Sequence, residues 1–209
     1  MTSAAPTTRP MTDGLPAGTA AVAPMIAGAV LTVGQLGQLA TLDRSDLVAT
    51  LADPAFRTFS AVYAAGFVAL VVALVALHLR QANRAGRFGF AAFCAAVLGT
   101  MVLGANMWFE AFASPWLIDV APQLLTTPKA AIWQVGYLSS YILFAVGWVA
   151  FGVSCLRAKV LPTAISVTVV VGGAIGFMAA QPPFALPLAL ALVAAGVWVR
   201  RVDRAAAQG

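Results

Sequence analysis

Six apolar stretches, each of the length needed to cross a lipid bilayer, make up most of this 209-residue chain. They cover residues 18–40, 57–79, 88–110, 130–155, 161–181 and 183–201. A membrane-spanning helix needs about 20 apolar residues. The runs are continuous and do not alternate with polar residues, which favours helices over a barrel. The sequence therefore predicts an all-α fold, a polytopic six-helix transmembrane bundle.

Composition supports this class, because 61% of the residues are hydrophobic and only 9% are charged. A soluble domain of this size carries far more charge, so we expect the bilayer to solvate most of the chain. The predicted transmembrane domain is residues 18–201. Residues 1–17, rich in Thr, Ala and Pro, are expected to form a disordered N-terminal tail, and residues 202–209 a cytoplasmic C-terminal tail.

The net charge of +5 indicates topology, and no nucleic-acid partner is expected. Basic residues follow the second, fourth and sixth spans, whereas the loops between carry acidic or mixed charge. By the positive-inside rule both termini are cytoplasmic, and the protein is expected in the plasma (inner) membrane of a bacterium as a multi-pass protein. The basic residues are Arg80, Arg84, Arg87, Arg157, Lys159, Arg200, Arg201 and Arg204.

Three proline pairs mark helix starts. Asp53-Pro54 and Thr127-Pro128 each combine a capping residue with Pro at the first helical position, and Ser114-Pro115 opens a short apolar helix at the outer interface. The first two pairs align at an offset of 74, and two aromatic pairs align with them. The offset predicts that the bundle is built from tandem helical hairpins. The aromatic pairs are Phe59 with Trp133 and Tyr63 with Tyr137.

Three segments carry a resemblance to a known group of proteins. They are DPAFRTFSAVYAAGFVALVVALVALHLRQANR, FASPWLIDVAPQLLTTP and LFAVGWVAFGVSCLRAKVLP, about half of the chain. In these segments the chain resembles a group of uncharacterised six-helix bacterial integral membrane proteins, many of them from actinobacteria. The resemblance implies the six-helix architecture and carries no activity.

Polar side chains within the spans gather toward the outer side of the membrane. Asn106 and Glu110 are four residues apart and share a helix face, as do Gln134, Tyr137 and Tyr141. Polar groups in lipid need partners, so these faces are predicted to meet. They form either a ligand cavity or hydrogen-bonded helix contacts beside an aromatic belt. The candidate ligand-binding residues are Gln35, Gln38, Tyr63, Asn106, Trp108, Glu110, Gln134, Tyr137, Tyr141 and Trp148.

Glu110 is the sharpest candidate, because an ionisable group inside a membrane is costly and usually functional. No Lys or Arg lies within a span to pair with it. Two readings remain open: Glu110 lines the cavity as a ligand-binding group or proton donor, or it lies at the water-exposed rim, since residues 88–108 already cover ~31 Å.

No metal site or cofactor is predicted. His78 is the only histidine, so paired haem ligation and a multi-histidine metal site are excluded. Cys94 and Cys155 lack the spacing of a metal or redox motif and are expected to be reduced packing residues.

Three functions fit these features. In the first, the protein binds or transports a small amphipathic or lipid-like ligand in an outward-facing polar and aromatic cavity around Glu110. In the second, it is an accessory or scaffolding subunit of a larger membrane complex or of a homo-oligomer. In the third, it is a membrane-embedded terpene cyclase, with Glu110 as the catalytic proton donor to an isoprenoid substrate. Membrane lipids are partners in each case.

Overall fold

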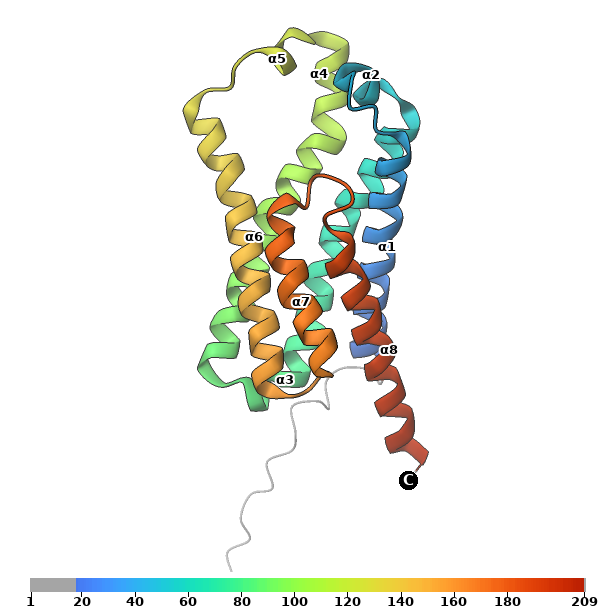
Figure 1. Ribbon diagram of the computed structural model, residues 1–209, viewed down its shortest axis with the longest axis vertical. Coiled ribbons are helices and arrows are strands. Elements are labelled where there is room, and N and C mark those ends of the chain that lie inside the picture. The colour runs from blue at the N-terminus through green and yellow to red at the C-terminus, as the bar shows by residue number, and fades with distance from the viewer. Residues whose placement is uncertain (1–17, 209) are drawn as a thin grey trace, which may run out of the picture.

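The computed structural model describes residues 18–208 as a bundle of helices (Figure 1), and no strand occurs in this part of the chain. The bundle consists of α1 (Thr19–Thr41), α3 (Pro54–Trp108), α6 (Ala131–Ala158), α7 (Thr163–Ile175) and α8 (Leu186–Gln208). Shorter elements connect them: α2 (Leu47–Ala52), the π-helical turn η2 (Phe109–Ala113), α4 (Ser114–Val120), α5 (Gln123–Thr126) and the 3-10 turn η3 (Gly176–Met178). The N-terminal tail predicted at 1–17 lies outside the described residues.

Helix α3 contains both the second and the third predicted spans. It breaks at Gly86, whose φ of 57° and ψ of −159° are not helical, so residues 54–85 form a first arm and residues 87–108 a second. The arms are antiparallel, since His78 stacks on Phe93 with ring centroids 4.2 Å apart. Glycine suits the reversal because a positive φ strains a residue that has a Cβ. With the arms counted separately, residues 18–208 contain the six bundle helices that the sequence predicts.

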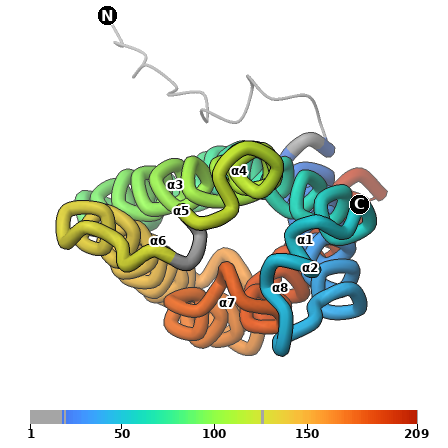
Figure 2. Tube along the Cα trace, turned by 90° about the horizontal axis from the view of Figure 1, so that it is seen from above, coloured from blue at the N-terminus to red at the C-terminus, as the bar shows by residue number. Residues whose placement is uncertain are grey.

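The helices form a closed ring when the bundle is seen from above (Figure 2). Its order is α1, the two arms of α3, α6, α7 and α8, which returns to α1. The core lies inside this ring, and its largest fully buried side chains include Trp148, Phe144 and Phe151 of α6. We call the end that carries α2, α4 and α5 the α4 end, and the opposite end the Gly86 end. Helix α1 begins and α8 ends at the Gly86 end (Figure 1).

The helices differ in how far they extend. Three helical stretches are long and apolar enough to cross a membrane: Ala20–Thr41, Pro54–Val120 and Ala131–Ala158. The fifth predicted span is shorter than expected, because the apolar helix covers only Thr163–Met178. The sixth, predicted from residue 183, begins at Leu186 and continues to Gln208 through most of the segment assigned to the C-terminal tail. The turn between α7 and α8 therefore lies partway along the bundle (Figure 1).

One of the three predicted helix starts is confirmed, and a second only in part. Asp53 caps α3 by accepting a hydrogen bond from the Ala55 amide, with Pro54 at the start of the helix. Helix α4 has Ser114 as its first residue and proline in its first turn, but it continues α3 and η2 without a break, and Ser114 does not cap it. The prediction at Thr127-Pro128 is wrong, because α6 begins at Ala131. Thr127 instead ends α5, and its hydroxyl donates to the Gln123 carbonyl, 2.7 Å away.

Candidate functional site

Glu110 lies in a π-helical turn, η2, at the junction of α3 and α4. The cause is Pro115, which follows in a continuous helical stretch. Proline has no N–H to donate, and its ring crowds the carbonyl one turn earlier, so the helix widens locally. Such turns are frequent at functional sites. Ala111 is buried, and Glu110 is half-buried.

The Glu110 carboxylate is joined to α6 by a chain of hydrogen bonds. The Tyr137 hydroxyl donates to Glu110 Oε1 at 2.9 Å, and the Tyr141 hydroxyl donates to the Tyr137 hydroxyl at 2.6 Å. The two tyrosine rings pack with centroids 4.9 Å apart, and the Tyr141 ring contacts Phe177 of η3 at 6.4 Å. The structure thus brings together the predicted residues Glu110, Tyr137 and Tyr141, which we call the Glu110 cluster.

Asn106 is the next polar residue along the same face, and it does not bond to Glu110. Its side-chain amide donates to Ser140 Oγ at 2.5 Å, and Ser140 donates in turn to the Tyr137 carbonyl at 2.6 Å. Further toward the Gly86 end, the Trp148 indole donates to Thr100 Oγ1 at 3.0 Å. Trp148 is completely buried. These two contacts join the second arm to α6, as interhelical hydrogen bonds do in membrane proteins.

Gln35 and Tyr63 hold the turn between α7 and α8. Gln35 Nε2 and the Tyr63 hydroxyl both donate to the Ala179 carbonyl, at 3.0 and 2.6 Å. Gln35 Oε1 accepts from the Ala185 amide at 3.3 Å. Gln38 donates to Ser60 at 3.0 Å, and its Oε1 has no partner. All three candidates therefore make contacts within the chain, and Gln35 and Tyr63 join α1 and the first arm of α3 to this turn.

The remaining candidates lie nearer the surface. Trp108 is 55% exposed and packs on Phe112, with ring centroids 4.4 Å apart. Gln134 is exposed and donates to the Lys129 carbonyl at 3.2 Å. Trp133 stacks on Tyr137 with ring centroids 4.8 Å apart and planes 13° from parallel. The Glu110 cluster thus continues as an aromatic stack toward the α4 end.

No other helix covers the first turns of α6. Residues 131–136 are all exposed, and a Cβ on Gly136 would meet no atom within 4 Å. Helix α7 is too short to cover these turns of α6. Its end, at Gly176, lies against Phe144, which is about two turns further along α6. The Glu110 cluster therefore lies where the covered part of α6 ends and its exposed part begins.

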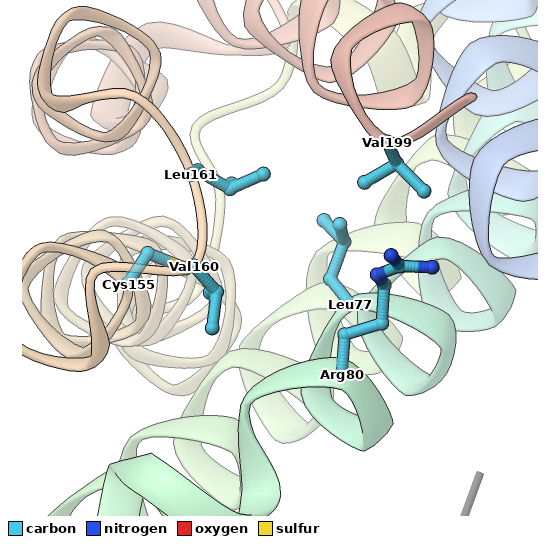
Figure 3. A pocket seen from close by; sticks show the side chains of 6 residues that line it. All are labelled: Leu77, Arg80, Cys155, Val160, Leu161 and Val199. Atoms are coloured by element: carbon cyan, nitrogen blue, oxygen red, sulfur yellow. The ribbon is translucent and has the colours of Figure 1, made fainter. Parts of the chain in front are cut away.

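A separate pocket lies at the Gly86 end (Figure 3). It is lined by Leu77, Arg80, Cys155, Val160, Leu161 and Val199. The Arg80 guanidinium forms a two-point ion pair with Asp203 of α8, with N–O distances of 3.0 and 2.6 Å. Helix α8 is therefore fixed to the first arm here, and none of the predicted ligand-binding residues lines this pocket.

Sequence reasoning missed several buried polar groups. Gln81 is fully buried with neither side-chain nitrogen nor oxygen bonded, and the hydroxyls of Ser154 and Ser166 are also unpartnered. It also missed Ser140 and Thr100 as partners and the π turn, for which Pro115 was the available signal.

His78 packs on aromatic rings, Cys94 and Cys155 are free, and the described residues hold no group of three or more potential metal ligands.

Comparisons with models of protein families, with curated proteins and with solved structures gave no match. The case for function therefore depends on the geometry of the Glu110 cluster.

Proposed function

We propose that this chain is a multi-pass protein of the bacterial inner membrane that binds a small amphipathic or lipid-like ligand at the Glu110 cluster. The helices of spanning length support membrane insertion. In the proposed orientation the Gly86 end is cytoplasmic, because basic residues gather there, around the break in α3 and at the ends of α6 and α8. The α4 end, with Glu110, then faces outward.

The observation that carries the proposal is the placement of Glu110. It is the only carboxylate between Asp53 and Asp119, and neither ion pair of the described chain involves it. One carboxylate oxygen accepts from Tyr137, and the cluster borders the exposed apolar start of α6. A polar group beside apolar surface matches the two parts of an amphiphile. An acid at this depth is costly to keep without a function.

The test compares two acid-to-amide substitutions at the α4 end. Glu110→Gln keeps the shape of the side chain and removes its charge, and Asp119→Asn is the matched control at an exposed acid. Protein purified in mild detergent is analysed by mass spectrometry for bound lipid-like compounds, with thermal stability measured alongside. We expect a compound bound to the wild type to fall at least tenfold in Glu110→Gln and to persist in Asp119→Asn. Equal amounts in all three proteins would contradict the proposal.

The orientation has its own test. In a variant lacking Cys94 and Cys155, single cysteines are placed at Asn83 near the Gly86 end and at Gln123 in α5. An impermeant thiol reagent added to intact cells should label position 123 and not position 83. The reverse pattern would turn the Glu110 cluster toward the cytoplasm.

A second candidate function is that of a subunit in a larger membrane complex. The exposed start of α6 favours it, since Ile132 is 79% exposed and Val135 is 63% exposed. A partner helix could cover this surface by packing on Gly136, where no atom of the chain is near. Purification in mild detergent distinguishes the two, because a subunit retains a partner in fixed stoichiometry whereas a ligand-binding protein retains a small molecule.

A further inference from the structure

The ligand class follows from what surrounds the Glu110 carboxylate, if the proposed function holds. Tyr137 lies between Trp133 and Tyr141, with ring centroids 4.8 and 4.9 Å away, and its hydroxyl bonds to Glu110. The faces of aromatic rings carry negative potential and attract cations. A carboxylate joined to a row of three packed rings therefore combines the two groups that bind an organic cation.

The chain itself provides a cation at this stack. Lys129 Nζ lies over the Trp133 ring, 5.9 Å from its centroid, and also bonds to the Leu124 carbonyl. The Lys129 ammonium group therefore occupies one side of the stack. The residue as a whole is partly exposed. This contact shows that the outer face of Trp133 accepts a positive group in this fold.

The segments around the stack also carry a net negative charge, which favours a cation. Residues 42–57 and 106–130, which form the α4 end and its approaches, contain five acidic residues and three basic ones, although the whole chain has a net charge of +5. Of the three basic residues, Arg57 is bound to the Leu51 carbonyl at 2.8 Å and lies 3.7 Å from Asp119. This end therefore attracts cations more than anions.

An apolar surface for the rest of the ligand adjoins the stack. Leu138 follows Tyr137 on α6 and is 50% exposed, and Trp133 itself is 43% exposed. We propose that the ligand is an amphipathic organic cation, whose positive group lies beside the Glu110 carboxylate and the aromatic rings bonded to it, while its apolar part lies along the exposed start of α6.

The experiment uses three amphiphiles with the same chain: dodecyltrimethylammonium, dodecanol and dodecyl sulfate, each below its micellar concentration. Binding to the full-length purified protein is measured by isothermal titration calorimetry, with protein-free detergent as the blank. We expect the cation to bind at least tenfold more tightly than dodecanol, and dodecyl sulfate to bind most weakly. Glu110→Gln should weaken binding of the cation at least tenfold and leave dodecanol unchanged, whereas Asp119→Asn should change neither.

Lys129 provides a second variant whose effect has the opposite sign. Lys129→Gln removes the internal cation from the Trp133 ring, so binding of dodecyltrimethylammonium should tighten two- to fivefold. If dodecanol binds as tightly as the cation and both depend on Glu110, the ligand class is wrong and the proposed function stands. If none of the three amphiphiles binds to the wild type, both proposals are overturned.

Discussion

The turn between α7 and α8 depends on two side chains from other helices, and this dependence can be measured. The Ala179 carbonyl accepts from Gln35 and from Tyr63, and the Ala185 amide donates to Gln35. These contacts are buried. The two prolines at 182 and 183 have no N–H with which to satisfy a carbonyl at the end of η3. We therefore expect the effects of substituting Gln35 and Tyr63 on the free energy of unfolding to be coupled.

The size of the coupling follows from which groups lose their last partner. Tyr63→Phe leaves the Ala179 carbonyl bonded to Gln35 and should cost about 1 kcal/mol, the net value of one hydrogen bond. Gln35→Met keeps a similar volume, but it leaves the Ala185 amide unpaired and should cost about 1–3 kcal/mol. Only the double variant leaves the Ala179 carbonyl without a partner. The loss of unfolding free energy in the double variant should therefore exceed the sum of the two single losses by about 1–3 kcal/mol.

The assay is unfolding in mixed micelles, with dodecyl sulfate as denaturant and far-UV circular dichroism as the readout, for the wild type, both single variants and the double variant. Leu36→Met is the control, because Leu36 follows Gln35 on α1 but is 48% exposed. A double variant whose cost equals the sum of the single costs within about 0.5 kcal/mol would refute the shared role of the Ala179 carbonyl.

Three further predictions concern other parts of the fold. Gly147→Ala should destabilise the protein by about 1–3 kcal/mol, because its Cβ would lie 2.6 Å from a backbone oxygen of the second arm; Gly136→Ala on the same helix should not, and thermal unfolding compares them. Gln81→Met should raise stability by about 1 kcal/mol in the same assay, because it removes two buried unpaired polar atoms. The Ser45 hydroxyl and amide donate to Asp43 and lower the pKa of its carboxyl, so their stabilising effect is present above the ordinary pKa and lost as the pH falls through the lowered one. Ser45→Ala should raise that pKa toward its ordinary value in an NMR titration, and an unchanged pKa would contradict the assignment.

The sequence predicted the helices well because their signals are local. An apolar run long enough to span a bilayer and a capping pair such as Asp53-Pro54 depend only on neighbouring residues. The same signal failed at Thr127-Pro128, because Thr127 ends α5 and the chain runs on without helical structure until α6 begins at Ala131. Hydropathy also overestimated the fifth span, because the residues of the turn that follows are nearly as apolar as those of the helix.

The sequence predicted which faces carry polar groups but not which residues would pair. Helical spacing placed Asn106 and Glu110 on one face and Tyr137 and Tyr141 on another. The pairing depends on the register of two antiparallel helices, and that register is set by close contacts elsewhere, such as Gly99 against Leu143. Asn106 consequently meets Ser140, and Glu110 meets Tyr137. Tertiary contacts of this kind leave no local signal in the sequence.

The shortness of α7 links the fold to the candidate site. The end of α7 and the η3 turn lie beside Phe144 and Tyr141 of α6. The first ten residues or so of α6, ~15 Å of helix, therefore extend beyond α7. A longer α7 would cover Tyr137 and close the approach to Glu110 from that side. Gln35 and Tyr63 hold the turn at its present depth, Gln35 from α1, which lies next to α8, and Tyr63 from the first arm of α3. Their role is therefore to fix where the covered part of α6 ends and its exposed part begins. Their replacement should change access to Glu110 even though neither side chain bonds to it.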